Sequence, residues 1–541
     1  MNIQKSIQKR GEQGIVLLLG IVSLAIVIPM VGISVDVGYL YTNKARMQAA
    51  VDGASLAAAR SLNLGQTTAQ QASTAQQNAV NWFYSNFPPG NWATRNTVMN
   101  TGTVVVDDAP GNPNLRRVRV TATTQVPTYF MKWFNFNATT LTSIGMATRR
   151  DAVIMLVLDR SSSMCVPNCN ACNEMKAAAK LFTGQFAAGR DYIGLVSFSD
   201  GTFIHYPPVQ NFRTALGYTS GSLTGNGAID TIVCSGGTGS AEAISMAYNT
   251  LYRRYLPGAF NVLVFESDGL PNTLAMNMWD GSSYGFANRD GCKDASGKSK
   301  TTGGWTTAAS ARQWRAGFPM NTITVDTPHV GLIPDIPAGA VGAMYSNDPG
   351  GISMQPFSDP FDTSGNSGIN AYNSSTMVSC SFTGTATSTA SNFADFAWLP
   401  GTDIMGNSVK PALNPYKTTV VMNGTHLKFD SSQSTNQRWQ NYHDATLNAA
   451  DNAAYRARAN TTIKPTVFVI GLGNTVDHTL LQRVANDPKG DVGGLYADCA
   501  INSACVHYDT QYSGTYIYAP TSAALRQKFL ELSSQILRLS Q

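Results

Sequence analysis

Carboxylate and hydroxyl side chains gather at points in the sequence where apolar runs end. Asp159, Ser161 and Ser163 follow one such run, and Asp268 follows another. Thr238 lies between them in the chain, directly after two glycines. All five side chains carry oxygen atoms, which are the ligands that hard cations such as Mg²⁺ prefer. The sequence therefore offers an oxygen-rich cluster, provided that the fold brings these segments together.

Alternating strands and helices are expected around these residues. Residues 151–158 contain a continuous apolar run, which is typical of a parallel strand buried on both faces, and residues 260–265 are expected to form a further buried strand. This alternation predicts an α/β fold with a doubly wound sheet, and in such sheets ligands bind beyond the carboxyl ends of the strands. The other expected elements are strands at 192–198, 203–206, 465–471 and 515–518, and helices at 173–188, 240–255, 436–460, 477–486 and 522–539.

The order D-x-S-x-S, distant Thr, distant Asp-Gly resembles the metal-ion-dependent adhesion site of von Willebrand factor type A domains. The resemblance implies a Rossmann-like domain that binds Mg²⁺ (or Mn²⁺ or Ca²⁺) and leaves a coordination position open for an acidic side chain of a protein partner. An A domain that keeps these loops for packing and binds no metal is the alternative. The residues that match are Asp159, Ser161, Ser163, Thr238 and Asp268.

The sequence does not favour an enzyme. Its six histidines form neither H-E-x-x-H nor a paired cluster. Asp159 lacks the second acid two residues on that a phosphotransfer aspartate would need, because Ser161 occupies that position. We assign no role to Arg160, Ser162, Glu266 or Ser267.

Composition narrows the class of protein further. Charged residues make up 13% of the 541 residues, about half the ~25% of typical soluble proteins, and the basic residues form no run longer than a pair. Nucleic acid is therefore not an expected partner, since it would need a clustered basic face. The length suggests two to four domains.

The eight cysteines all lie at or beyond residue 165. An even set in one part of the chain predicts disulfides in an oxidising compartment. A zinc site at residues 165–172 is the alternative, although no second C-x2-C pair accompanies it. The expected bridges are Cys499–Cys505, Cys292–Cys380, and Cys234 with one of Cys165, Cys169 or Cys172.

A membrane span is predicted at about residues 14–34, where no residue is charged. Twenty-one helical residues reach about 30 Å, the thickness of the hydrocarbon core. A cleaved signal peptide is the alternative, but the run is longer than the usual apolar region and no A-x-A-like site directly follows it. The Ala-rich residues 43–62 predict that the helix continues.

Arg10-Gly11 before the span, Asp36-Val37-Gly38 after it and the helix that follows together resemble the amino terminus of TadE/TadG-like proteins of the tight-adherence (Flp) pilus system. The resemblance implies a single-pass protein of the bacterial inner membrane. Because all the cysteines follow the span and are expected to form disulfides, we expect a cytoplasmic amino terminus and a periplasmic or cell-surface bulk. Because Glu12 directly follows Gly11, before the span, we expect no prepilin-type cleavage there.

Three parts of the chain are expected. Residues 1–62 form the transmembrane helix and stalk, 63–150 a small α+β pilin-like module with strands at 102–108, 117–129 and 140–148, and 151–541 the A domain with a large insertion at about 270–435. The expected function is metal-dependent binding or adhesion to a protein ligand, or to pilus or secretion components. A structural assembly factor, or a minor pilin at a pilus tip with no external ligand, is the alternative.

Overall fold

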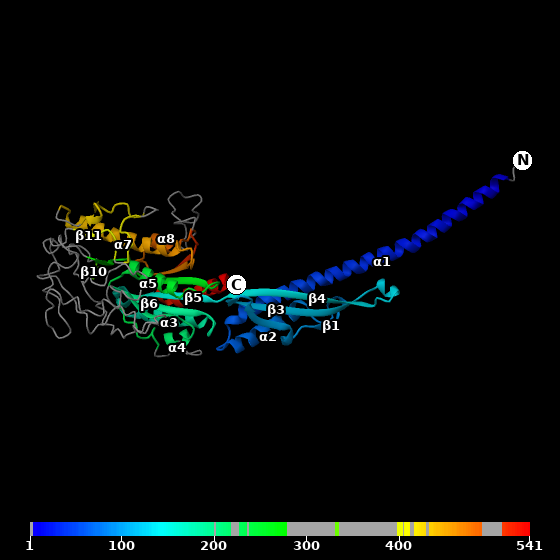
Figure 1. Ribbon diagram of the computed structural model, residues 1–541, viewed down its shortest axis with the longest axis horizontal. Coiled ribbons are helices and arrows are strands. Elements are labelled where there is room, and N and C mark those ends of the chain that lie inside the picture. Colours follow the sequence, from blue (N-terminus) through cyan, green and yellow to red (C-terminus); the bar gives the residue numbers. More distant parts are fainter. Residues whose placement is uncertain are drawn as a thin grey trace. The chain divides into compact units, whose positions relative to one another are not determined.

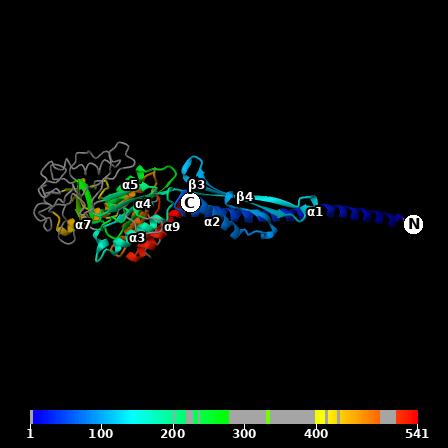
Figure 2. The same ribbon diagram turned by 90° about the horizontal axis from the view of Figure 1, so that it is seen from below.

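The computed structural model describes residues 4–199, 202–217, 227–234, 237–277, 330–334, 398–403, 405–411, 416–428, 432–488 and 511–540. The chain splits into two compact units, Met1–Arg150 and Asp151–Ser540. Figures 1 and 2 show the elements of each unit in two views.

One continuous helix, α1 (Gln4–Arg60), opens the first unit, as the sequence predicts. Its large apolar side chains from Val16 to Val31 are mostly exposed. Within the described part of the chain, α1 is the one helix long and apolar enough to cross a membrane. Pro29 lies inside it, and membrane helices tolerate proline.

The second half of α1 packs into the core of the first unit. Met47, Val51 and Ala54 are fully buried there. Helix α2 (Thr68–Asn86) begins with a capping box between Thr67 and Gln70 and lies against α1. It buries Ala75, Ala79 and Phe83 at a spacing of four residues, which places them on one face of the helix.

An antiparallel sheet completes this unit. Strands β2 (Val104–Ala109) and β3 (Asn112–Pro127) form a hairpin, and β3 pairs with β4 (Ala138–Arg150). The three strands predicted here are therefore confirmed, whereas β1 (Arg95–Val98), which also pairs with β3, was not predicted. Alternate residues of β3, namely Val118, Val120 and Ala122, are buried against the helices. A Cβ at Gly145 would lie 2.8 Å from the carbonyl oxygen of Val51, so only glycine lets β4 approach α1 this closely.

The second unit contains the predicted doubly wound α/β sheet, which is confirmed. The six strands lie in the order β15-β14-β8-β5-β6-β7, and all are parallel except β7 at one edge. Every residue of β5 and β8 is buried, which explains why β5 is apolar up to Asp159 and why β8 is largely apolar. The strands are β5 (Ala152–Asp159), β6 (Tyr192–Phe198), β7 (Thr202–Val209), β8 (Phe260–Ser267), β14 (Thr466–Leu472) and β15 (Thr515–Ala519).

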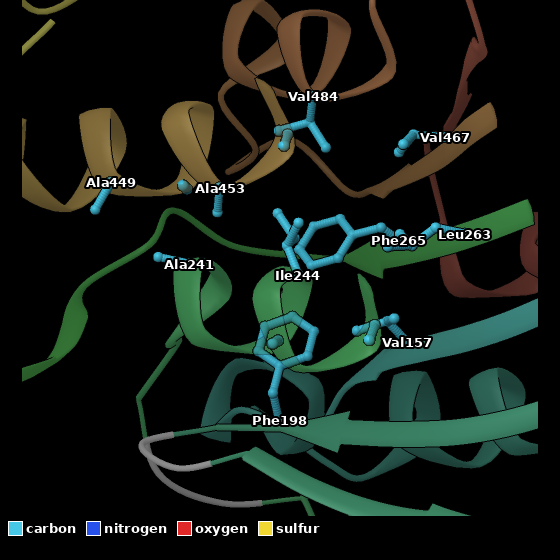
Figure 3. Close-up of a cluster of buried hydrophobic side chains, with 14 of the residues drawn as sticks. Val157, Phe198, Ala241, Ile244, Leu263, Phe265, Ala449, Ala453, Val467 and Val484 are labelled. Carbon is cyan, nitrogen blue, oxygen red and sulfur yellow. The ribbon is translucent and has the colours of Figure 1, made fainter. Parts of the chain in front are cut away.

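Helices cover both faces of this sheet. Val157 of β5 points to the core shared with α5, α7 and α8, whereas its neighbours Leu156 and Leu158 point to the core shared with α3 and α9. Figure 3 shows the first core, in which Ile244 of α5 and Val484 of α8 meet Phe265 of β8. The helices are α3 (Asn170–Gly184), α4 (Phe212–Leu216), α5 (Ser240–Arg253), α7 (Thr435–Arg458), α8 (His478–Ala485) and α9 (Leu525–Leu539).

The described parts of the insertion are tied to α7. Three asparagines on this helix, at intervals of seven and four residues, each donate from their side chain to two backbone carbonyls of the preceding segment. Asn441 binds Val421 and Lys428, Asn448 binds Val409 and Lys417, and Asn452 binds Ser408 and Lys410. The strands of this region are β9 (Thr273–Asn277) paired with β10 (Val330–Pro334), and β11 (Trp398–Pro400), β12 (Met422–Asn423) and β13 (His426–Lys428) in one small sheet.

Two disulfides lie beside the sheet. Cys172 of α3 pairs with Cys234, with Cα atoms 6.3 Å apart, so the prediction that Cys234 joins one of the three nearby cysteines is confirmed. Cys165 pairs with Cys169, which was not predicted and leaves no thiolate for the zinc alternative. The expected Cys292–Cys380 and Cys499–Cys505 bridges lie outside the described residues.

Candidate metal site

Two neighbouring parallel strands bring the key carboxylates to one edge of the sheet. Strand β5 ends at Asp159, and Asp268 comes directly after β8. The two strands pair in register, with Leu158 opposite Glu266, so both chains leave the sheet at the same level. The short helical turn that contains Ser163 follows β5, and the loop that contains Thr238 precedes α5.

Hydrogen bonds join four of the five predicted residues, three of them through their side chains. The Ser163 hydroxyl donates to Asp268 Oδ1 at 2.7 Å, and the Ser161 hydroxyl lies 3.3 Å from the same oxygen. The two serine hydroxyl oxygens are 2.8 Å apart. The backbone N–H of Ser161 donates to Asp159 Oδ1 at 2.8 Å, which closes the turn around that carboxylate. The geometry thus gathers hydroxyl and carboxylate oxygens around Asp268.

Thr238 borders the same space. A Cβ built on Gly269 would lie 3.6 Å from Thr238 Oγ1 and 3.8 Å from Ser163 Oγ. The backbone N–H of Thr238 donates to the side chain of Asn272 at 2.6 Å, which fixes the Thr238 loop to the segment after β8. The structure therefore places the five residues predicted from the sequence beside one another at the strand ends.

Glu266 and Ser267 hold Asp159 in place, so the expectation that these two residues have no role was wrong. The Ser267 hydroxyl donates to Asp159 Oδ2 at 2.6 Å. Glu266 is completely buried, and its carboxyl accepts the backbone N–H of Asp159 at 3.2 Å. A charged residue at the end of an otherwise apolar strand was the available signal, since a glutamate is rarely buried without a local reason.

The three acidic side chains perturb one another. Burial, and then the charge of Asp159, raises the pKa of Asp268 to about 7. Burial and the charges of Asp159 and Asp268 raise the pKa of Glu266 well above its ordinary value. Burial likewise raises the pKa of Asp159. Like charges in a poorly solvated site disfavour ionisation, and a bound cation would relieve that repulsion.

The donor set decides which cation would fit. Within the ranges that the structure describes, no group of three or more His, Cys, Asp and Glu side chains is arranged to hold a metal. A cation at this edge would therefore depend on the serine and threonine hydroxyls as well as on Asp159 and Asp268. Such an all-oxygen set suits Mg²⁺, Mn²⁺ or Ca²⁺ and not metals that prefer nitrogen or sulfur.

A serine–histidine contact occurs elsewhere in this unit. Ser197 Oγ and His205 Nε2 are 2.8 Å apart, on the adjacent strands β6 and β7. Burial, and then the charge of Arg160, lowers the pKa of His205 to about 3. Ser197 is 0% and His205 7% exposed, so a substrate cannot approach this hydroxyl as it would a catalytic nucleophile.

Two family models match parts of the chain. Residues 154–270, which carry all five side chains of the site, match the family model of the von Willebrand factor type A domain. The second unit is thus a von Willebrand A-type α/β domain. Residues 14–61 match the Tad family of TadE/G-like Flp pilus-assembly proteins. The chain therefore combines a TadE/G-like amino-terminal segment with a von Willebrand factor type A domain.

Several solved structures match the chain at low sequence identity and with low TM-scores. The vWF domain of the type V pili tip protein Mfa5 from Porphyromonas gingivalis is 14% identical, with 73% of this chain and 98% of that chain covered and a TM-score of 0.32. The PilB minor pilin from Streptococcus sanguinis is 11% identical, with 83% and 80% covered and a TM-score of 0.30. The pilus adhesin SpaC from Lactobacillus rhamnosus GG is 10% identical, with 81% and 36% covered and a TM-score of 0.32. A search of curated proteins finds no match.

Proposed function

We propose that this protein is a membrane-anchored, non-enzymatic binding protein of tight-adherence (Flp) pilus assembly, which recognises a protein partner through a divalent cation. The observation that carries the proposal is the convergence of the Ser161 and Ser163 hydroxyls on Asp268 Oδ1, with Asp159 on the adjacent strand and Thr238 alongside. The TadE/G-like match of residues 14–61 supports the pilus-assembly context.

The cation would be held by Asp159, Ser161, Ser163, Thr238 and Asp268. A Mg²⁺ (or Mn²⁺ or Ca²⁺) ion bound there would have an open coordination position, which an oxygen of the partner, such as the carboxylate of an acidic side chain, could fill. Glu266 and Ser267 would orient Asp159 from behind, through the two hydrogen bonds that they make with it.

The anchor would be the apolar part of α1, at about residues 14–34, in the bacterial inner membrane. The two disulfides favour an oxidising compartment for the A domain, which gives a cytoplasmic amino terminus and a periplasmic or cell-surface bulk. A structural assembly factor, or a pilus-tip minor pilin without an external ligand, is the second candidate. Recovery of the chain in sheared surface fibres, and not in the inner-membrane fraction, would favour the pilin.

Calorimetric titration of the EDTA-treated full chain in mild detergent tests the metal. We expect uptake of about one Mg²⁺ or Mn²⁺ per chain, and a higher melting temperature because the ligand binds only the folded state. Asp159→Ala should abolish both effects while the α/β fold persists. Ser162→Ala is the matched control, because Ser162 is exposed and lies between two of the proposed ligands. A folded wild-type chain that takes up neither ion would refute the cation, and docking would then have to use another surface.

A further inference from the structure

The hairpin loop between β3 and β4 exposes an unusual amount of aromatic surface. Trp133 is 72%, Phe136 60%, Phe134 55% and Tyr129 48% exposed. These four residues, called the aromatic tip below, lie within eight consecutive positions. Contiguous apolar surface of this kind on a folded protein marks a site of contact with another apolar phase.

The tip is fixed to α1. The Asp36 carboxylate accepts the backbone N–H groups of Tyr129, Phe130 and Met131 at 2.9, 2.9 and 2.7 Å. Although burial by itself raises the pKa of Asp36, these three N–H groups lower it below its ordinary value, so the carboxylate is charged at neutral pH. Asp36 is fully buried beneath the loop. These hydrogen bonds therefore hold the aromatic tip at a fixed position along α1.

Contacts between the side chains of the loop and α1 also fix the position of the aromatic tip along the helix. The Phe130 ring lies on Gly32, where an added Cβ would come within 2.6 Å of the ring. Tyr129 meets Tyr39 edge to face, with ring centroids 5.4 Å apart. Gly32 lies near the carboxyl end of the span proposed at residues 14–34. At 1.5 Å per residue, the contacts at Gly32 and Asp36 fall within about 6 Å of the place where α1 would leave the hydrocarbon core.

We propose that the aromatic tip inserts into the interfacial layer of the same bilayer that α1 spans, among the phospholipid headgroups. This inference rests on the proposed membrane anchor. Tryptophan and tyrosine rings prefer this layer because their apolar bodies and polar edges match its two sides.

Two features favour lipid as the occupant over a protein. The loop lies against Gly32, whose neighbours Val31 and Ile33 on α1 expose apolar side chains, so one apolar phase would cover both. Lys132, which is exposed within the tip, would meet lipid phosphates at this depth. The first unit would then hold the bilayer at two points, and its tilt on the membrane would be restricted.

Tryptophan fluorescence of the full chain in vesicles of phosphatidylcholine brominated at acyl carbons near the headgroup tests the proposal. We expect these lipids to quench a component of the emission that disappears in Trp133→Phe, since only groups at that depth touch the bromines. Trp82→Phe is the matched control. Trp82 is also half exposed, at 48%, but it lies on Gly53, about 30 Å further along α1.

Alkaline carbonate extraction of the same vesicles separates the two proposals. If the chain is retained and Trp133→Phe loses no more quenching than Trp82→Phe, the aromatic tip is not in the interface and only this inference falls. If carbonate releases the chain, the anchor is refuted and the inference with it. Retention together with a Trp133-specific loss supports both. Trp133→Phe keeps an aromatic ring beside Phe130, and circular dichroism of the variant checks its fold.

Discussion

Replacing Asp268 by asparagine should stabilise the metal-free protein, although the side chain is buried and hydrogen-bonded. Burial and the charge of Asp159 raise the pKa of Asp268 from 3.8 to about 7. The folded state therefore binds this proton more tightly than the unfolded state does. Stability is lost as the pH rises from about 4 to about 7, and the loss is complete above that window.

The size of the effect follows from the pKa shift. About three units at 1.36 kcal/mol each give an upper value of about 4 kcal/mol at pH 8. Asparagine carries no charge but keeps an oxygen that can accept the Ser163 hydroxyl, so the hydrogen bond at 2.7 Å need not be lost. A gain of roughly 2–4 kcal/mol corresponds to a rise in melting temperature of roughly 2–5 °C for a unit as large as Asp151–Ser540.

Magnesium should stabilise the wild-type chain much more than the Asp268→Asn variant, because the variant lacks one of the proposed carboxylate ligands. At one hundred times its dissociation constant, Mg²⁺ would stabilise the wild-type chain by about 2.7 kcal/mol, whereas Asp268→Asn should gain almost nothing. Scanning calorimetry of the full chain in mild detergent at pH 8, with EDTA and with MgCl₂, measures both effects. Asp52→Asn is the control, because Asp52 is exposed on α1 and pairs with Gln48. The reasoning fails if Asp268→Asn melts below wild type in EDTA, or if Mg²⁺ shifts both proteins equally.

Three further outcomes are expected. Mg²⁺ affinity should fall between pH 8 and pH 6, because protons compete for Asp268 below its pKa of about 7, and titration calorimetry at the two pH values measures this. Replacing both Cys172 and Cys234 by serine should lower the free energy of unfolding, measured by urea titration, by about 4 kcal/mol, because that disulfide joins residues 62 positions apart. Replacing Cys165 and Cys169, which are only 4 positions apart, should lower it less. Arg483→Leu should lower the free energy of unfolding by about 3–5 kcal/mol, because it removes the guanidinium 2.5 Å from the buried Asp451 carboxylate. Adding Asp451→Leu should recover much of this loss, because no unpaired charge is then left buried. Equal stabilities of the single and double variants would contradict this reasoning.

Local patterns in the sequence were enough for most elements of the fold. Buried parallel strands have largely apolar sequences, and β5 and β8 lie close to where the apolar segments predict them. The short strand β1 was missed, because its four residues are partly or wholly exposed and carry no apolar alternation. It is a strand only because β3 offers it a pairing edge.

The five candidate ligands were also visible in the sequence, because each follows a strand or precedes a helix at an interpretable position. The contacts that hold these ligands in place, such as those of Glu266 and Ser267 with Asp159, were not visible in the sequence. That Ser267 donates to Asp159 depends on β5 and β8 being neighbours in the sheet, a pairing between segments 108 positions apart. No local pattern encodes such a distance.

The sequence by itself determined the set of helices and strands, the long apolar helix and the residue types at the strand ends. These features depend on periodicity and composition over a few residues. The tertiary structure decided which cysteine Cys234 would join, that the second half of α1 is core and not a free stalk, and that Asp36 holds the loop of Tyr129. Each of these depends on which distant surfaces meet, and that choice is made by the packing of the whole chain.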